Sequence, residues 1–378
     1  MHGRLQEPDS DNRSKNEPSK ACHLYCSILL HSSMSDPTLS VVVTSYNYGR
    51  YLPECLRAIF GQDPAPLEVL VIDDASTDDS VQIVENLQKT HSHLRLIHNQ
   101  TNQGILAVLD IALREARGDY ILFAAADDWV LPGLLLRSME LLRSYPEAAF
   151  CSALSLQVTE KNATPSYFPT LIALNHPGFI PPRRVLDLLL RDDNWFMGNT
   201  IVLRRQAALK MGGFRPELFS FCDGFLYQQM ALKYGVCFIP APLAVWRRHG
   251  TGYSSASIVN VERLLAIYHE ATRLMKEDYP ALFPPEYVAR WQNRWRYLAL
   301  KGALSLGNYC LTKIRQIWPD AKFLDRLMLN LTTGMGAAGC RLSTLYLFAR
   351  LRWRDFLPSL RRRLSWALRR IVINSKRT

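Results

Sequence analysis

The sequence predicts an α/β protein with a mostly parallel central sheet, followed by a C-terminal helical extension. Two observations lead to this fold class. From Leu39 onward, short runs of β-branched residues alternate with longer segments whose apolar residues recur at the period of a helix. From about residue 256 to the end, the pattern is helical throughout. The 378 residues give room for one large domain or two ordinary ones.

The strands and helices of the first part follow one another in regular order. Strands that alternate with helices of this length predict βαβ units and therefore parallel strands. The predicted strands are Ser40–Thr44, Val69–Ile72, Leu94–His98 and Tyr120–Phe123. The predicted helices are Leu52–Phe60, Asp79–Lys89, Ile105–Ala116 and Leu134–Ser144. The uncharged stretch 162–182 contains five prolines and predicts a loop.

Three segments are expected along the chain. Residues 1–38 form a polar, irregular leader that lacks the apolar stretch of a signal peptide. Translation from Met1 and translation from Met34, which lies five residues before Leu39, both fit this leader. Residues 39–255 form the α/β domain, and residues 256–378 form the helical region, with a break near Pro284.

The segment 341–378 carries nearly all of the chain's net charge of +11, with eleven Lys or Arg and one acid, Asp355. Pro358 is expected to divide it into two helices. Arg-rich amphipathic helices with Trp on the apolar side suit an anionic membrane surface, at the inner face of the cell membrane. Helices packed on the α/β domain are the alternative. The apolar stripe comprises Leu342, Leu345, Tyr346, Ala349, Trp353, Phe356, Leu357, Leu360, Leu364, Ala367 and Ile371.

Charge and cysteine content exclude other classes of protein. The rest of the chain is close to neutral, whereas a nucleic-acid-binding protein usually spreads positive charge over a binding face, so no nucleic-acid partner is expected. The eight cysteines form no CxxC pair, which is typical of reduced thiols in a cytoplasmic protein. The sequence contains no run of about 18 apolar residues, so no membrane-spanning helix is expected.

Polar residues follow three of the predicted strands, at the point where each strand ends. They are Ser45–Asn47, Asp73–Asp74 and Asp127–Asp128. In parallel sheets, ligands bind at the carboxyl ends of the strands. Carboxylates there supply hard oxygen ligands for a divalent cation and hydrogen-bond acceptors for a polar ligand. A helix cap or turn explains any single Asp pair, but recurrence at corresponding strand ends favours a function.

Four sequence strings follow one another in the α/β part. They are Ser40–Asn47 (SVVVTSYN), Val71–Asp78 (VIDDASTD), Asn102–Gly104 (NQG) and Gly118–Asp128 (GDYILFAAADD) with Pro132. In this order and spacing, the chain from about residue 39 to 255 resembles a family 2 glycosyltransferase of the GT-A fold. The resemblance implies a nucleotide-sugar donor (a UDP-, GDP- or dTDP-sugar), a sugar or lipid-linked acceptor, and Mg²⁺ or Mn²⁺ as cofactor.

The resemblance also implies roles for residues of the donor side. Thr44 and Tyr46 would contact the base and ribose, with Asn47 beside them, and Asp74 would accept a hydrogen bond from the nucleobase. Asp127 would approach the ribose, and Asp128 would hold the metal that bridges the diphosphate. Many members have an acid at the position of Ala125, which gives a DxDD string. Its absence here leaves fewer protein ligands for the metal.

The acceptor side follows, with a strand predicted over 198–203 and a helix opening near Asp223. In the family a Glu-Asp pair heads this helix and its Asp is the catalytic base. The Asp is kept here as Asp223, and the Glu is replaced by Cys222. A helix N-cap is the alternative role for Asp223. Arg248 and His249 resemble basic residues that face the diphosphate leaving group in the family, where cations stabilise anionic charge.

The function expected from this resemblance is inverting, metal-dependent transfer of a hexosyl-type sugar to an acceptor hydroxyl, in cell-surface polysaccharide or glycolipid assembly. A nucleotidyltransferase is one alternative, although the Gly-rich, basic phosphate loop typical of that class is missing after the first strand. A non-catalytic module that binds nucleotide sugars is the other. The GxGxxG string at 334–339 lacks the βαβ context of a dinucleotide site. Gln292–Trp295 is one residue short of the QxxRW string of processive synthases.

Overall fold

The computed structural model describes residues 36–159, 162–169, 171–193, 195–248, 260–305, 315–333 and 335–375. The chain divides into two compact units, Met1–Pro37 and Thr38–Thr378. Of the first unit, only Asp36 and Pro37 are described, so nearly all of the predicted leader lies outside the described residues. All that follows concerns the second unit.

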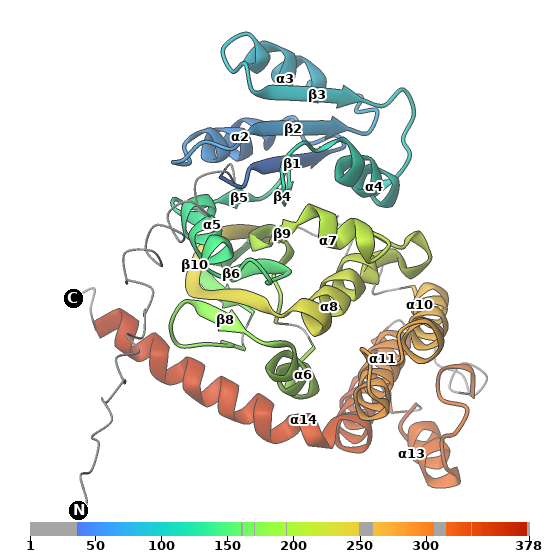
Figure 1. Cartoon of the computed structure of the whole chain (residues 1–378). Coiled ribbons are helices and arrows are strands. Elements are labelled where there is room, and N and C mark those ends of the chain that lie inside the picture. The colour runs from blue at the N-terminus through green and yellow to red at the C-terminus, as the bar shows by residue number, and fades with distance from the viewer. Residues whose placement is uncertain are drawn as a thin grey trace, which may run out of the picture. The chain divides into compact units, whose positions relative to one another are not determined.

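The second unit is built on one ten-stranded sheet (Figure 1). The strand order is β3-β2-β1-β4-β9-β6-β10-β5, with β7 paired to β6 and β8 paired to β10. The long pairings, β1 with β2 and β4, β2 with β3, and β6 with β10, are parallel, and the shorter ones are antiparallel. The predicted mostly parallel sheet is therefore confirmed. The strands are β1 (Leu39–Ser45), β2 (Glu68–Asp73), β3 (Leu94–His98), β4 (Tyr120–Ala125), β5 (Trp129–Val130), β6 (Phe150–Thr159), β7 (Asn162–Phe168), β8 (Gly178–Ile180), β9 (Val202–Arg204) and β10 (Val236–Arg248).

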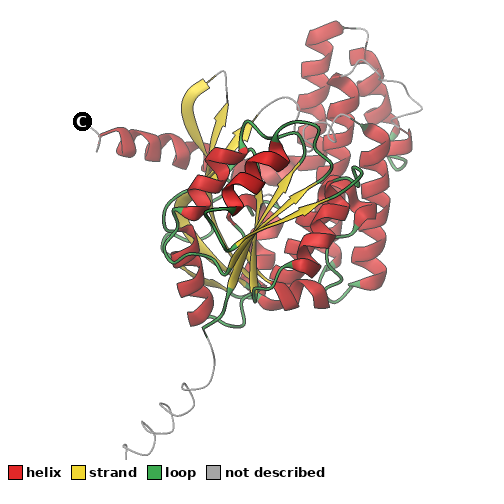
Figure 2. Ribbon diagram, turned by 90° about the horizontal axis from the view of Figure 1, so that it is seen from above, coloured by secondary structure: helices red, strands yellow, loops and turns green. Residues whose placement is uncertain are grey.

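Helices cover both faces of the sheet (Figure 2). On one face, α2 (Leu52–Phe60), α3 (Ser80–Gln88) and α5 (Leu134–Ser144) pack in a core that includes Val41 and Val43 of β1. On the other face, Val42 belongs to a second core. Successive side chains of a strand point to opposite faces, which explains why the consecutive residues Val41, Val42 and Val43 of β1 are all apolar and buried. The helices of the second face are α4 (Ile105–Glu115), α6 (Pro182–Arg191), α7 (Arg205–Lys210) and α8 (Cys222–Tyr234).

The C-terminal region is helical, as predicted. Leu274 and Trp291 belong to the same core as the second face of the sheet, so the first helices of this region pack on the α/β part. The division at residue 255 stays a prediction. A further core joins the last helices to α11 through Leu300, Leu329 and Leu347. The elements are α10 (Val261–Arg273), the π-helical turn η3 (Leu274–Asp278), α11 (Pro285–Ser305), α13 (Phe323–Thr333) and α14 (Gly336–Ser375). Within the described ranges, no helix has the length and apolarity needed to cross a membrane.

The predicted loop at 162–182 is wrong, because β7 and β8 lie in it. Both are edge strands, and β7 pairs with β6 alone. An edge strand tolerates proline since one side of its backbone needs no partner, and Pro165 lies outside the paired register. Composition alone therefore failed to separate a proline-containing edge strand from a loop.

The predicted strand at 198–203 is partly wrong. A 3₁₀ turn, η1, occupies Gly198–Thr200, and β9 begins only at Val202. The Thr200 hydroxyl accepts from the Ala153 amide at 3.0 Å, and the carbonyl oxygens of Met197 and Ala153 both lie within reach of its single hydrogen, at 2.8 and 3.1 Å. A side chain thus bonds to the backbone groups of β6 that a longer β9 would have paired.

The predicted break at Pro358 is also corrected. The backbone of α14 is helical through residue 358, and the non-helical residue is Arg352 (φ −124°, ψ 16°). Arg352 Nε donates to Asp355 Oδ2 at 2.8 Å. The break in the helical backbone of α14 is therefore at Arg352, next to its contact with Asp355, and not at residue 358.

Candidate active site at the carboxyl edge of the sheet

The parallel strands β1, β2 and β4 end together. In the register, Ser45 of β1 lies opposite Asp73 of β2, and Thr44 lies opposite Ala125 of β4. The loops that follow these strands, 46–51, 74–79 and 126–128, therefore leave one edge of the sheet. The structure brings the three predicted polar clusters to that edge, where ligands of parallel sheets bind.

Asn47 joins two of these loops. Its backbone is left-handed (φ 56°), a conformation that Asn tolerates better than most residues. Its amide N–H donates to Ser76 Oγ at 2.8 Å, and its Oδ1 accepts from the Thr77 amide at 2.8 Å. These bonds hold the loop after β1 against the loop after β2. The neighbouring Tyr46 side chain is exposed, and Thr44 is half-buried.

Asp74 is buried and accepts three hydrogen bonds from the chain. Asn99 Nδ2 and the Gln103 amide donate to Oδ1 at 2.8 and 2.9 Å, and the Gly104 amide donates to Oδ2 at 2.8 Å. This carboxylate therefore fixes the NQG turn at the start of α4. Since a carboxylate has about four lone-pair positions, room remains for one further donor, such as that of a nucleobase.

Asp128 is buried at the end of the β4 segment and is held by two donors. Asn199 Nδ2 donates to its Oδ2 at 3.0 Å, and the Arg247 amide donates to its Oδ1 at 2.9 Å. Burial and the adjacent Asp127 carboxylate raise the pKa of Asp128 from about 3.8 to about 7, and the two hydrogen bonds oppose this rise only in part. A buried carboxylate in this condition favours a positive partner.

Two residues that support Asp128 were missed from the sequence. Asn199 also lies 3.4 Å from Ser155 Oγ and from the Val245 carbonyl oxygen, and its own Oδ1 is buried without a partner among the described residues. Arg247 donates through Nε to the Asp127 carbonyl oxygen at 3.1 Å and forms an ion pair with Glu54 at 2.6 Å. The sequence held one signal for Asn199: it is a polar residue between Gly198 and Thr200 in an otherwise apolar run.

Arg247 is also enclosed by aromatic rings. Its guanidinium lies 4.8 Å from the centroid of Tyr51 and 4.9 Å from that of Trp129. Arg248, which was predicted as a donor-binding residue, is exposed, and its guanidinium lies 5.5 Å from the ring of Trp246. His249 lies outside the described residues. Of the two arginines, Arg247 is the one tied to the aspartate pair.

The donor set at this edge fits a divalent cation. Mg²⁺ and similar ions are usually held by one or two carboxylates, with substrate phosphates and water completing the shell. Asp127 and Asp128 provide two adjacent carboxylates, and the raised pKa of Asp128 shows that its negative charge is poorly compensated. In the part of the chain that the structure describes, no group of three or more His, Cys, Asp or Glu gathers in metal-binding geometry.

Asp223 lies in the first turn of α8, two residues after the N-cap position, which Phe221 occupies. Its Oδ1 accepts from the Gly224 amide at 2.6 Å. Burial raises the pKa of Asp223 despite this bond, so desolvation outweighs the stabilising effect of the helix start. The hydrogen bonds and charge interactions described for Asp223 involve its own helix, including Cys222 and Tyr227, and none of them joins it to Asp128. The N-cap alternative is not what this structure shows.

Comparison with known proteins places the chain in a family. Residues 40–211 match the family model described as Glycosyl transferase family 2. The uncharacterized protein MT1568 of Mycobacterium tuberculosis (strain CDC 1551 / Oshkosh) is 30% identical over 239 residues, which cover 60% of this chain and 72% of that protein. An uncharacterized glycosyltransferase of Haemophilus influenzae is 32% identical over 124 residues, covering 31% of this chain and 50% of that protein.

Solved structures share the fold. The crystal structure of S. aureus TarS 1–349 in complex with UDP-GlcNAc matches with a TM-score of 0.50 and 17% identity, covering 83% of this chain and 91% of that chain. At this identity the likeness concerns the fold, a mixed α/β sheet of GT-A type. The chain belongs to glycosyl transferase family 2 and has the GT-A fold.

Proposed function

We propose that the protein transfers a hexosyl-type sugar from a nucleoside-diphosphate sugar to an acceptor hydroxyl, with inversion at the anomeric carbon and with Mg²⁺ or Mn²⁺ as cofactor. The observation that carries the proposal is Asp128, a buried carboxylate with a raised pKa beside Asp127, at the edge where β1, β2 and β4 end. Membership of glycosyl transferase family 2 and glycosyltransferase relatives support it.

On this proposal, the loop after β1 and the Asp74 carboxylate bind the nucleoside. Asp74 has a lone pair left for a base N–H, and its three bonds to Asn99, Gln103 and Gly104 keep it in place. Tyr46 is exposed beside this carboxylate's loop and offers a ring for stacking. Asn47 holds this loop in shape, and Thr44, near the end of β1, is proposed to contact the base and ribose together with Tyr46. A bound metal would neutralise the negative charge that develops on the diphosphate leaving group.

Asp127 and Asp128 would hold that metal, and hydrogen bonds from other residues of the chain fix their positions. Asn199 and the Arg247 amide fix the Asp128 carboxylate, and the Arg247 guanidinium fixes the carbonyl of Asp127. Arg248 and His249 follow directly in the chain, and on this proposal their positive charges face the diphosphate. Preorganisation of this kind lowers the energy needed to rearrange the site during reaction.

Asp223 is proposed as the general base. An acceptor hydroxyl is a weak nucleophile at neutral pH, and a positioned carboxylate that accepts its proton accelerates attack. Burial raises the pKa of Asp223, which makes it a stronger base than an exposed carboxylate. A hydrogen bond from the Gly224 amide to Oδ1 orients this carboxylate, and on this proposal it accepts the proton of the acceptor hydroxyl.

The acceptor is proposed to be a sugar or a lipid-linked sugar, in the assembly of cell-surface polysaccharide or glycolipid. The protein would then work in the cytoplasm at the inner face of the cell membrane, with the basic segment 341–378 at the lipid surface. Within this segment, Leu347 and Leu351 of α14 pack in a core with α11 and α13. On this proposal, one face of α14 packs on the protein and another face meets the lipid.

The experiment that tests the proposed function is a screen of UDP-, GDP- and dTDP-sugars for hydrolysis and transfer, with and without Mn²⁺. We expect turnover of one donor class that stops when a chelator is in excess and returns when Mn²⁺ is restored. Full activity in excess chelator would contradict the metal requirement, while the absence of turnover with every donor would contradict the transferase activity.

A further inference from the structure

The helices α13 and α14 present apolar side chains to solvent. On α13, Phe323 is 76% exposed and Leu331 is 63% exposed. Residues spaced three and four apart share one face of a helix, so these side chains form one stripe. The opposite side of α13 packs on α14 through Leu329 and through Thr332, which contacts Ser343. The members of the stripe are Phe323, Leu324, Leu327, Met328 and Leu331.

α14 repeats this arrangement. Leu345 is 67% exposed and Trp353 is 63% exposed, and Leu342 lies on the same exposed face. The helix packs instead through Leu347 and Leu351, which are buried. The apolar stripe recognised in the sequence is thus, in its described part, largely the face that α14 does not use for packing.

Elsewhere in the described part of the chain, large exposed apolar residues occur singly. Leu67, Leu136 and Leu209 lie on three different segments and are 48%, 38% and 36% exposed. Single exposed leucines are ordinary, whereas several exposed apolar residues on one side of a helix mark an interaction site. We use the name hairpin face for the exposed stripes of α13 and α14 taken together, which comprise Phe323, Leu324, Leu327, Met328, Leu331, Leu342, Leu345 and Trp353.

The charges around the hairpin face are positive on balance. Lys322, Arg341 and Arg354 are exposed beside its members, and the Arg354 guanidinium lies 5.5 Å from the Trp353 ring. The nearby acids are already paired, and one of them, Asp320, lies 3.2 Å from Arg296. Asp325 bonds to Tyr346 and, at 3.0 Å, to Arg350, and the residues after Asp355 add only basic charge.

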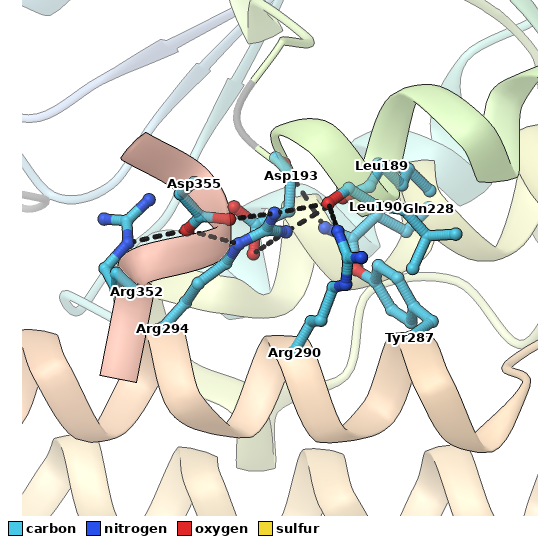
Figure 3. A network of polar contacts seen from close by, with 9 residues as sticks. All are labelled: Leu189, Leu190, Asp193, Gln228, Tyr287, Arg290, Arg294, Arg352 and Asp355. Atoms are coloured by element: carbon cyan, nitrogen blue, oxygen red, sulfur yellow. Dashed lines mark hydrogen bonds and ion pairs between the residues drawn. The ribbon is translucent and has the colours of Figure 1, made fainter. Parts of the chain in front are cut away.

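Asp355 fixes α14 to the α/β part (Figure 3). Asp355 Oδ1 lies 3.1 Å from Arg294 Nη2, and both side chains are buried. Arg294 Nη1 also donates to the Leu189 carbonyl oxygen at 2.8 Å, at the end of α6. Separating the two partners would leave an uncompensated charge in the interior, so the pair opposes movement of this part of α14 away from α6. The QNRW string therefore contributes Arg294 to a structural ion pair, and the hairpin face keeps a set orientation on the enzyme.

We propose that the hairpin face docks on an anionic lipid bilayer, with its Leu, Phe and Trp side chains entering the headgroup region and the basic residues lying against the lipid phosphates. Leu and Trp on one side of a helix with Arg on its flanks is the pattern of helices that lie in the plane of the interface. A protein partner of neutral charge would leave the bases unpaired. The inference rests on the proposed function only for the lipid-linked nature of the acceptor.

The test uses the full-length protein and vesicles. We expect the parent to sediment with vesicles of phosphatidylglycerol and phosphatidylcholine and to bind vesicles of phosphatidylcholine alone far less. The triple variant Phe323→Ser, Leu324→Ser, Leu331→Ser should bind the mixed vesicles at least about tenfold more weakly, because each removed side chain loses the apolar surface it would bury. All three positions are well exposed, so the melting temperature should stay near that of the parent.

Matched controls separate the hairpin face from surface hydrophobicity and from the terminal segment. Leu67→Ser and Leu136→Ser remove exposed leucines elsewhere and should leave vesicle binding unchanged. Brominated phosphatidylglycerol should quench tryptophan fluorescence in the parent, and Trp353→Phe should remove much of this quenching. Truncation after Asp355 keeps the Arg294 pair and should retain the quenching while reducing the salt dependence of binding.

Three outcomes would overturn the inference. They are a parent that ignores anionic vesicles at low salt, a triple variant that binds like the parent, and a lipid-free dimer of the parent that the triple variant abolishes. The last would assign the hairpin face to a second copy of the chain. Donor hydrolysis measured on the same preparations with soluble nucleotide sugar keeps the inference separate, because the triple variant should hydrolyse donor as the parent does.

Discussion

The carboxyl ends of β2 and β4, which flank β1, carry similar aspartate pairs with opposite electrostatic conditions. At the end of β2, Asp73 accepts from the amide and the hydroxyl of Ser76, and Asp74 accepts three bonds, so that both carboxylates are well solvated by the protein. At the end of β4, Asp128 has two donors and a raised pKa of about 7.

Two aspartates after a strand thus meet different surroundings at the two ends. The β2 pair holds the adjoining loops together, since its oxygens accept from backbone amides of two turns. At the β4 end, burial and the neighbouring Asp127 carboxylate raise the pKa of Asp128 by more than its two hydrogen bonds lower it. On the proposed function, the number of donors therefore distinguishes a carboxylate that holds loops from one that would hold a metal.

The largest effect is expected for Asp128→Ala. If Asp128 holds the metal, its loss removes the cation that stabilises the leaving group, and transfer should fall by at least about a thousandfold. Steady-state rates with the active donor and Mn²⁺ measure this. Asp73→Asn is the matched comparison at β2, and it should reduce transfer far less. Near-parental turnover by Asp128→Ala would remove the distinction between the two ends.

Asp223→Asn should come second. The amide preserves shape and can still accept from the Gly224 amide, but it cannot accept a proton, so transfer should fall by at least about a hundredfold while donor binding stays the same. Calorimetric binding of the nucleoside diphosphate and the melting temperature serve as controls. Unfolding of this variant would point to a structural role instead, and parental turnover would place the base elsewhere.

The third prediction compares the stability of two alanine variants. Asp74→Ala leaves the Gln103 and Gly104 amides and Asn99 Nδ2 without their acceptor, which should lower the free energy of unfolding by about 2–4 kcal/mol. Asp128→Ala in the metal-free protein also removes a poorly compensated charge, so its loss should be clearly smaller. Urea unfolding in chelator measures both. Equal losses would show that the two ends do not differ in the way proposed.

The sequence predicted the β2 end better than the surroundings of the β4 end, and the reason is the distance along the chain. Asn47 and Asp74 bond to partners 29 or 30 residues away, and the strands that lead to them contain the apolar runs Val41–Val43 and Val69–Ile72. Asn199 lies 71 residues from Asp128, and Arg247 lies 119 residues from it. Local pattern reveals a strand or a helix, but it cannot show which distant amide completes a buried carboxylate. The helix ends of α2 and α5 were predicted to the residue for the same local reason.

The sequence left two interpretations of the apolar stripe of α14 open, contact with a lipid surface and packing on the α/β domain. Leu345 and Trp353 of that stripe are exposed, whereas Leu347 and Leu351, which lie outside it, pack on the neighbouring helices. Both sides of this stretch are apolar, and only the position of α11 and α13 decides which side is covered. Periodicity finds amphipathic helices, and the partner determines their orientation.

The smallest expected effect is the pH dependence of stability and of metal affinity that follows from the raised pKa of Asp128. Its pKa is raised in the folded protein from about 3.8 to about 7, so the folded state binds this proton more tightly than the unfolded chain does. In the metal-free protein, the stability contributed by the protonated carboxyl is present at acid pH and is lost as the pH rises between these two values.

A divalent cation needs the deprotonated form, so its affinity should fall about tenfold for each pH unit below 7, or about 1.4 kcal/mol. Melting curves with and without Mn²⁺ across this range should show metal stabilisation growing toward pH 7 and then levelling, and Asp128→Asn should remove both slopes. In that variant, Asn199 can turn its unpartnered Oδ1 toward the new amide, which keeps the fold intact for the measurement. Metal stabilisation that ignores pH in the parent would mean that the cation is held elsewhere, and the contrast between β2 and β4 would lose its functional meaning.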